Sequence, residues 1–173
     1  MNIFELKVWD DEGARCTFYT VQQQDDPENE TDKFFAKYEE AEGLEEQIGI
    51  LLSFVLDSIG NDHGALDALF NRNENEVKGL PAQGKVRIGE VMLHFPNFPL
   101  RLYALKITDE LVVLFNGGVK DGPTNQQSSL YIKWIEACQF AKRIMEALVS
   151  KEILVDERNR KLTDGTGGND LAL

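Results

Sequence analysis

The chain has 173 residues, 42% of them hydrophobic, which is enough for a single domain with its own core. Its net charge of -12 argues against a surface built mainly to bind nucleic-acid phosphates. The charge is uneven, however: residues 1–80 have 19 acidic and 6 basic side chains, whereas residues 81–173 have 11 and 12. The acidity therefore belongs to the first half, where a solvated surface explains it, and a phosphate-binding site in the second half remains open.

Targeting and cofactor signals are not found. Charges at Glu5, Lys7 and Asp10 interrupt the apolar segment that a signal peptide would need, and no run approaches the roughly 18 apolar residues of a membrane span. We therefore expect a cytoplasmic protein that does not contact a membrane. Cys16 and Cys138 lie far apart without metal-ligand spacing, so we predict no disulfide framework, no metal site and no cofactor.

The first half predicts a β-hairpin followed by helices. Residues 2–9 and 15–22 have strand-favouring patterns around a turn, and a polar loop follows them. Residues 34–43 predict a short helix that ends at Gly43. Apolar residues between Leu44 and Ile59 then recur with helical spacing, which predicts an amphipathic helix closed by Gly60. We expect these helices to form a helical hairpin, with a third short helix possible around residues 65–70.

The second half predicts β-structure and then a long helix. Residues 85–95 alternate with a change of register at Gly89, which indicates a bulge. Residues 100–107 and 110–116 predict a hairpin whose second strand is apolar on both faces and so belongs at the centre of a sheet. An apolar stripe predicts a helix over residues 128–150, built on Leu130, Trp134, Cys138, Ala141, Met145 and Leu148.

Together these elements predict one α+β domain over residues 1–160. Its small antiparallel sheet packs against the helical hairpin and the long C-terminal helix, and the N-terminal β-hairpin is an extension. Residues 161–173 have too little apolar content to pack, so we expect a disordered tail.

The stretch FPLRLYALKITDELVVLFNGGVKD, residues 98–121, is the most specific part of the sequence. Arg101 and Tyr103 open a strand, an apolar strand follows the turn, and Gly118, Val119 and Lys120 lead out of it. With a helical hairpin before it and a three-stranded antiparallel run, residues 45–135 resemble the RelE/ParE toxin superfamily. The N-terminal hairpin, the acidic first half and the long C-terminal helix are departures from the compact family form.

This resemblance implies the toxin of a toxin-antitoxin system. Some members of the family cut messenger RNA on the ribosome, others poison DNA gyrase, and a cognate antitoxin restrains them. The implied partners are an antitoxin and the ribosome or mRNA, and the implied activity is a metal-independent endoribonuclease. Internal attack by a 2′-hydroxyl needs a base, a cation near the phosphate and a donor for the leaving oxygen.

The resemblance assigns Arg101, Lys120 and Tyr131 to catalysis. Arg101 would hold the phosphate bidentately, Lys120 stands at the basic exit of the family's sheet, and Tyr131 corresponds to the aromatic that some members use for stacking or proton transfer. Lys85 and Arg87 share one strand face and would extend an RNA-binding surface. The exit loop contains fewer basic residues than is usual in the family, which counts against an intact nuclease.

Each residue also has a structural interpretation. Arg101 could pair with an acid of the first half, the two lysines and Arg87 could be solvated, and Tyr131 could pack in its helix. At the level of the whole chain, the alternatives are a noncatalytic acidic binding or regulatory protein on the same fold and an α+β domain unrelated to the family.

Overall fold

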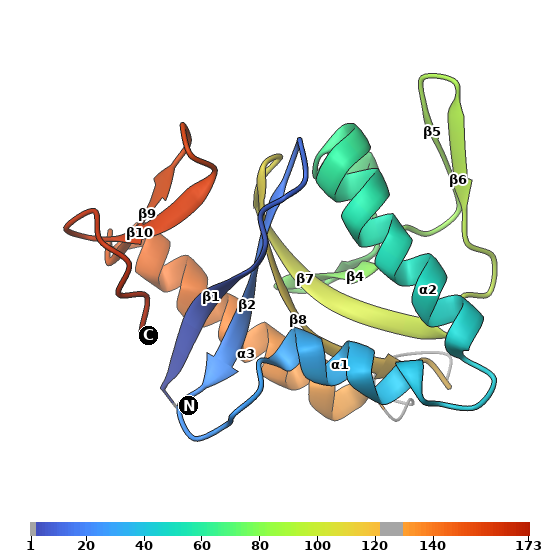
Figure 1. The fold of residues 1–173 in the computed structure, drawn as a ribbon, viewed down its shortest axis with the longest axis horizontal. Coiled ribbons are helices and arrows are strands. Elements are labelled where there is room, and N and C mark those ends of the chain that lie inside the picture. The colour runs from blue at the N-terminus through green and yellow to red at the C-terminus, as the bar shows by residue number, and fades with distance from the viewer. Residues whose placement is uncertain (1–2, 122–129) are drawn as a thin grey trace.

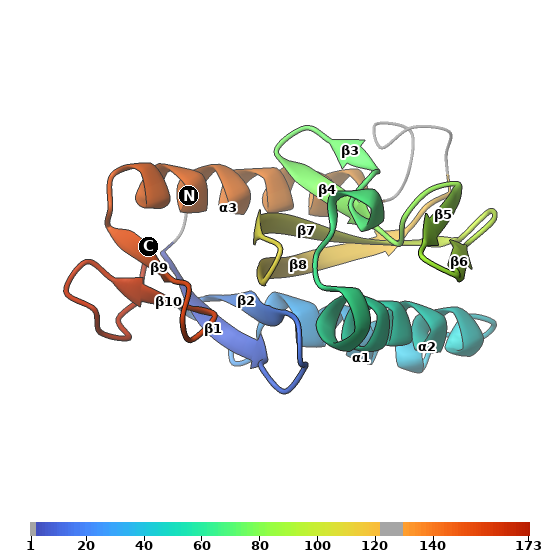
Figure 2. The same cartoon turned by 90° about the horizontal axis from the view of Figure 1, so that it is seen from above.

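The computed structural model describes residues 3–121 and 130–173 and shows three layers. A six-stranded sheet lies between α3 on one side and the α1–α2 pair on the other (Figure 2). The strands stand in the order β1-β2-β8-β7-β4-β3. Their bounds are β1 Phe4–Asp10, β2 Thr17–Gln23, β3 Asn73–Glu74, β4 Val77–Leu80, β7 Leu100–Thr108 and β8 Leu111–Val119.

The sheet is mixed, so the prediction of a small, purely antiparallel sheet is wrong. β2 pairs with β8 in parallel, while the other neighbours in the sheet are antiparallel. Parallel neighbours need a long connection, and here it includes α1, α2, β4 and β7. The predicted N-terminal hairpin is confirmed, but it is part of the main sheet rather than an extension of it.

The central position of β8 is confirmed. Its side chains are buried on both faces because helices cover both sides of the sheet. Val112 and Leu114 belong to the core under α1 and α2, which we call the α1 face. Val113 and Phe115 belong to the core under α3, the α3 face. Each face therefore has its own hydrophobic core.

The helical pair of the α1 face is also confirmed (Figure 1). Helix α1 (Glu30–Glu39) starts earlier than predicted, because the side chain of Asn29 accepts a hydrogen bond from the Asp32 N–H and caps the helix. Helix α2 (Glu45–Ser53) continues into a π-helical segment, Phe54–His63, and so passes the predicted stop at Gly60.

Two shorter predictions need correction. Residues 85–95 do not form one bulged strand but a separate hairpin, β5 (Lys85–Ile88) and β6 (Val91–His94), turning at Gly89 with φ +60°. The change of alternation at Gly89 therefore marks a turn, which needs the left-handed conformation that glycine adopts easily. The possible third helix is a single 3₁₀ turn, Asp67–Leu69.

The long C-terminal helix is confirmed as α3, Tyr131–Val149. Its predicted start at residue 128 lies outside the described residues. The stripe prediction was partly wrong: Met145 is 37% exposed, and the buried side chains are those of Ala137, Phe140, Ala141, Ile144 and Ala147. Among the described helices, α3 included, none combines the length and the apolar character needed to cross a bilayer.

Residues 161–173, expected to be disordered, are ordered. Strand β10 (Lys161–Asp164) pairs with β9 (Ile153–Asp156), and residues 171–173 then lie along β1. The N–H groups of Phe4 and Leu6 donate to the carbonyls of Leu173 and Leu171 at 3.1 Å each, and Leu171 is 4% exposed. Backbone pairing with an open sheet edge orders this segment despite its low apolar content.

The Asp164 carboxylate holds the turn before this segment. It accepts hydrogen bonds from the N–H groups of Thr166, Gly168 and Asp170 at 2.8 to 3.1 Å, which together with the Thr166 hydroxyl lower its pKa well below the ordinary 3.8. Because the ionised form accepts these bonds, their support is complete above about pH 4 and is lost as the pH falls through the lowered pKa.

We expect Asp164→Ala to loosen residues 165–173 without unfolding the domain. Hydrogen exchange at pH 7 should show at least a tenfold loss of protection at the Phe4, Leu6 and Leu173 amides, while the amides of β7 and β8 keep theirs. Asp25→Ala, which removes an exposed carboxylate elsewhere, serves as the control. Unchanged protection in Asp164→Ala would show that the turn does not depend on this carboxylate.

Candidate functional site

Arg101 is a buried cation in a central strand. It lies on β7 with Tyr103 and Leu105, which face α3, whereas Leu100 and Leu102 face α1 and α2. The residue is 8% exposed, and its guanidinium donates to the carbonyl oxygens of Phe98 (2.8 Å) and Leu100 (2.9 Å). Burial, with repulsion from Arg72, lowers the pKa of Arg101 to about 10, so the group remains cationic at neutral pH.

The structural alternative for Arg101, an ion pair with an acid of the first half, is not found in the described part of the chain. Backbone carbonyls hold one nitrogen of the guanidinium instead. Neutral acceptors do not cancel the charge of a guanidinium, so Arg101 still attracts anions.

Gly79 allows a second arginine to approach Arg101. A Cβ atom at Gly79 would lie 2.8 Å from Cδ of Arg72 and 3.7 Å from Cδ of Arg101. Both arginine side chains therefore extend over the same glycine of β4. The Nε–H of Arg72 donates to the Pro81 carbonyl at 3.3 Å, which fixes part of its guanidinium.

Lys120 completes a group of three cations, Arg72, Arg101 and Lys120, that we call the cationic corner. It directly follows β8, and its N–H donates to the Pro99 carbonyl at 2.7 Å. Burial lowers the pKa of Lys120, and the charges of Arg101 and Arg72 lower it further. The Glu74 carboxylate acts in the opposite direction on both Lys120 and Arg101, so it belongs to the same neighbourhood.

Two members of this neighbourhood, Arg72 and Glu74, were missed by the sequence reasoning. They stand in the polar stretch NRNEN before β4, which has no apolar alternation to mark the two-residue strand β3. The available signal was Gly79 inside the strand VKGL, because a glycine within a strand can mark the close approach of other groups.

Tyr103 lies beside the corner but is fully buried. Burial, with the charge of Glu74, raises the pKa of its phenol far above neutral. Tyr103 therefore stays protonated at neutral pH, and its buried ring packs beside the cationic corner.

Tyr131 is the first residue of α3 and is 37% exposed. Its ring contacts Trp134, with centroids 5.8 Å apart, and the indole N–H of Trp134 donates to the Glu74 carbonyl at 3.0 Å. Within the described residues, Tyr131 is connected to the corner through Trp134 and the β3 backbone.

Lys85 and Arg87 lie elsewhere. They are exposed on one face of the β5–β6 hairpin, opposite His94 and Met92. Val86 between them packs into the core of the α1 face, whereas Arg101 points to the α3 face. The structure does not bring these two residues together with Arg101.

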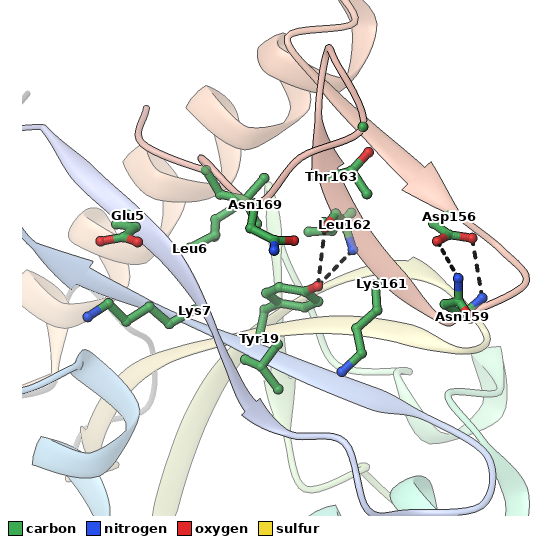
Figure 3. A pocket seen from close by; sticks show the side chains of 13 residues that line it. Glu5, Leu6, Lys7, Tyr19, Asp156, Asn159, Lys161, Leu162, Thr163 and Asn169 are labelled. Atoms are coloured by element: carbon green, nitrogen blue, oxygen red, sulfur yellow. Dashed lines mark hydrogen bonds between the residues drawn. The ribbon is translucent and has the colours of Figure 1, made fainter.

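A broad hollow of about 670 Å³ lies between β1 and the β9–β10 hairpin (Figure 3). The Tyr19 hydroxyl accepts from the Leu162 N–H at 2.7 Å and donates to its carbonyl at 3.4 Å. Lys161 forms an ion pair with Asp11, and Asp156 accepts from Asn159. These polar groups are paired with one another. Their interactions mainly hold the β9–β10 hairpin against the sheet.

The charges of the cationic corner suit an anionic ligand. Three cations, one of them a buried arginine, converge where α3 starts and β8 ends, and a carboxylate stands among them. No three His, Cys, Asp or Glu side chains within residues 3–121 and 130–173 gather so as to hold a metal ion. Comparison with known proteins gave no match to any family model, curated protein or solved structure.

Proposed function

We propose that this chain is an RNA-directed toxin of a toxin-antitoxin system, and that the cationic corner is its phosphate site. The observation that carries the proposal is the pair of arginine side chains over Gly79, with Arg101 buried and held by neutral carbonyls. Two guanidinium groups and an ammonium suit a phosphodiester, since arginine binds phosphate oxygens bidentately. The likeness of residues 98–121 to the RelE/ParE superfamily supplies the class of substrate.

The same groups suit ribonuclease chemistry without a metal. Arg101 and Arg72 would offset the charge that builds on the phosphate as the 2′-hydroxyl attacks. Glu74 could accept the hydroxyl proton, and Lys120, whose pKa burial lowers, could give a proton to the leaving oxygen. Tyr131, Lys85 and Arg87 are not required by this scheme.

Growth arrest with RNA cleavage is the expected result of expression in a bacterial host. Wild type, Arg101→Ala and Arg158→Gln would be induced to matched soluble levels, followed by growth curves and 5′-end mapping of messenger RNA. Arg158 is an exposed cation between β9 and β10 and serves as the control. We expect arrest and new RNA ends for wild type and Arg158→Gln, and neither for Arg101→Ala. Normal growth and intact RNA with folded wild-type protein would contradict the nuclease proposal.

A second candidate is a noncatalytic protein that binds a basic partner. It is favoured by the excess of 19 acidic over 6 basic side chains in residues 1–80, which include the whole α1–α2 pair. In that case expression leaves RNA intact, and the partner's association weakens steeply with salt.

A further inference from the structure

The exposed flank of α3 has an apolar stripe that lies largely outside the core, although Cys138 in its middle is half-buried and packs against the core of the α3 face. We define the outer stripe as the six residues Tyr131, Ile135, Cys138, Lys142, Met145 and Val149. The helix buries its opposite side, around Ala141 and Ile144, against the sheet. Val149 is 84% exposed, and Tyr131 and Met145 are 37% exposed. Large apolar side chains gathered on one helix face mark an interaction surface.

The spacing of the outer stripe is 4, 3, 4, 3 and 4 residues, which is the spacing of a coiled-coil seam. It is also symmetrical about residue 140. When two such helices meet antiparallel on a twofold axis, Tyr131 of each copy lies against Val149 of the other. Ile135 likewise meets Met145, and Cys138 meets Lys142. A surface that complements itself in this way fits a second copy of the same chain.

Charge complementarity supports the same pairing. Lys142 is the charged member of the outer stripe, and the thiol of Cys138 donates to the Glu74 carbonyl at 3.8 Å, which places the exposed Glu76, two residues further on, close to Cys138. When Lys142 of one copy meets Cys138 of the other, it also lies near Glu76 of that other copy. The twofold axis repeats this Lys142–Glu76 contact, so the dimer has two of them. A single lysine in a coiled-coil seam specifies register.

The net charge of α3 favours contact between two copies here rather than elsewhere. The helix has three basic and two acidic side chains, whereas the whole chain has a net charge of -12. Much of the remaining surface is acidic and would repel its own copy.

The shape of the stripe offers an anchor point. A shallow hollow of about 420 Å³ lies beside Met145 and Val149. Antiparallel pairing places the Tyr131 ring of the other copy next to Val149, at this hollow. Aromatic side chains in such positions contribute much of the affinity of an interface.

We propose that two copies of this chain form a twofold-symmetric dimer through antiparallel contact of their outer stripes. The dimer does not depend on the function of the cationic corner, and it makes Tyr131 an interface residue.

Sedimentation equilibrium over a range of protein concentrations tests the proposal. We expect wild type to approach twice its chain mass of 19.6 kDa at micromolar concentrations. Val149→Glu should weaken the association at least 100-fold, while Ile132→Glu should not. Ile132 is 61% exposed on the same helix but lies outside the stripe, so it is a matched control, and circular dichroism checks the fold of each variant.

A charge exchange tests the register. Lys142→Glu should weaken the dimer at least tenfold, and adding Glu76→Lys should restore it. A wild-type chain that remains monomeric up to about 100 µM would overturn the proposal. So would a dimer that Val149→Glu leaves unchanged, or one that the charge exchange does not rescue.

Discussion

Gly117→Ala is expected to destabilise the domain by more than about 3 kcal/mol, since it forces an extra atom into a packed core. A Cβ atom at Gly117 would lie 1.8 Å from the carbonyl oxygen of Arg101 and 2.8 Å from its carbonyl carbon. Both are backbone atoms of the neighbouring central strand, so no flexible side chain can move away. The β7–β8 pair would have to separate at the place where Arg101 is held.

Urea unfolding followed by circular dichroism measures this effect, and Gly49→Ala is the matched control. Gly49 lies in α2, and a Cβ atom there would have no neighbour within 4 Å. That change should stabilise the chain by up to about 1 kcal/mol, because alanine favours a helix over glycine. Equal unfolding midpoints for Gly117→Ala and wild type would mean that β7 and β8 are not this close.

Removing two cations of the corner should weaken the binding of single-stranded RNA about 100-fold at low salt. Charge-assisted hydrogen bonds contribute roughly 1.5 to 3 kcal/mol each, and Arg72→Gln with Lys120→Gln removes two such donors. This double variant retains the buried Arg101, so the packing around β7 is unchanged.

The salt dependence of binding separates phosphate contacts from other losses. Each contact to single-stranded RNA contributes a slope of about -0.7 in a plot of log affinity against log salt. Three cations predict a slope of about -2 for wild type, and the double variant should fall to about -0.7. Lys151→Gln with Arg158→Gln removes the same charge beyond the far end of α3 and should leave the slope unchanged. Equal slopes in both double variants would indicate only a general effect of charge.

The predictable part of the fold was the part with strong local patterns. The apolar run 110–116 indicated a central strand, and the helical spacing after Leu44 and Leu130 indicated the helices of both faces. The parallel contact of β2 with β8 was not predictable, since it joins segments about 90 residues apart and depends on how the helices between them pack. The segment 171–173 was missed because its order depends on backbone hydrogen bonds to β1, which leave no pattern in the sequence, and because the two leucines that pack against the core, Leu171 and Leu173, are too few to indicate a strand.

Only part of the candidate site could be predicted from the sequence. Arg101 and Lys120 lie in or next to strands that the sequence marks clearly, and the structure places them in one neighbourhood. Lys85 and Arg87 were grouped with them because residues 85–95 looked like another strand of the same sheet, and the separate hairpin removes that reason. Arg72 reaches the corner through a chain reversal at β3 and β4, which only tertiary structure reveals.

The most direct test of the phosphate site is NMR of the arginine side chains. The Nε–H signals of Arg72, Arg101 and Arg158 would be followed while a short single-stranded RNA is added to the full chain. We expect the Arg72 and Arg101 signals to shift together along one binding curve, with Arg158 unaffected. RNA that leaves Arg72 and Arg101 unshifted, or that shifts Arg158 equally, would contradict a phosphate site at the cationic corner.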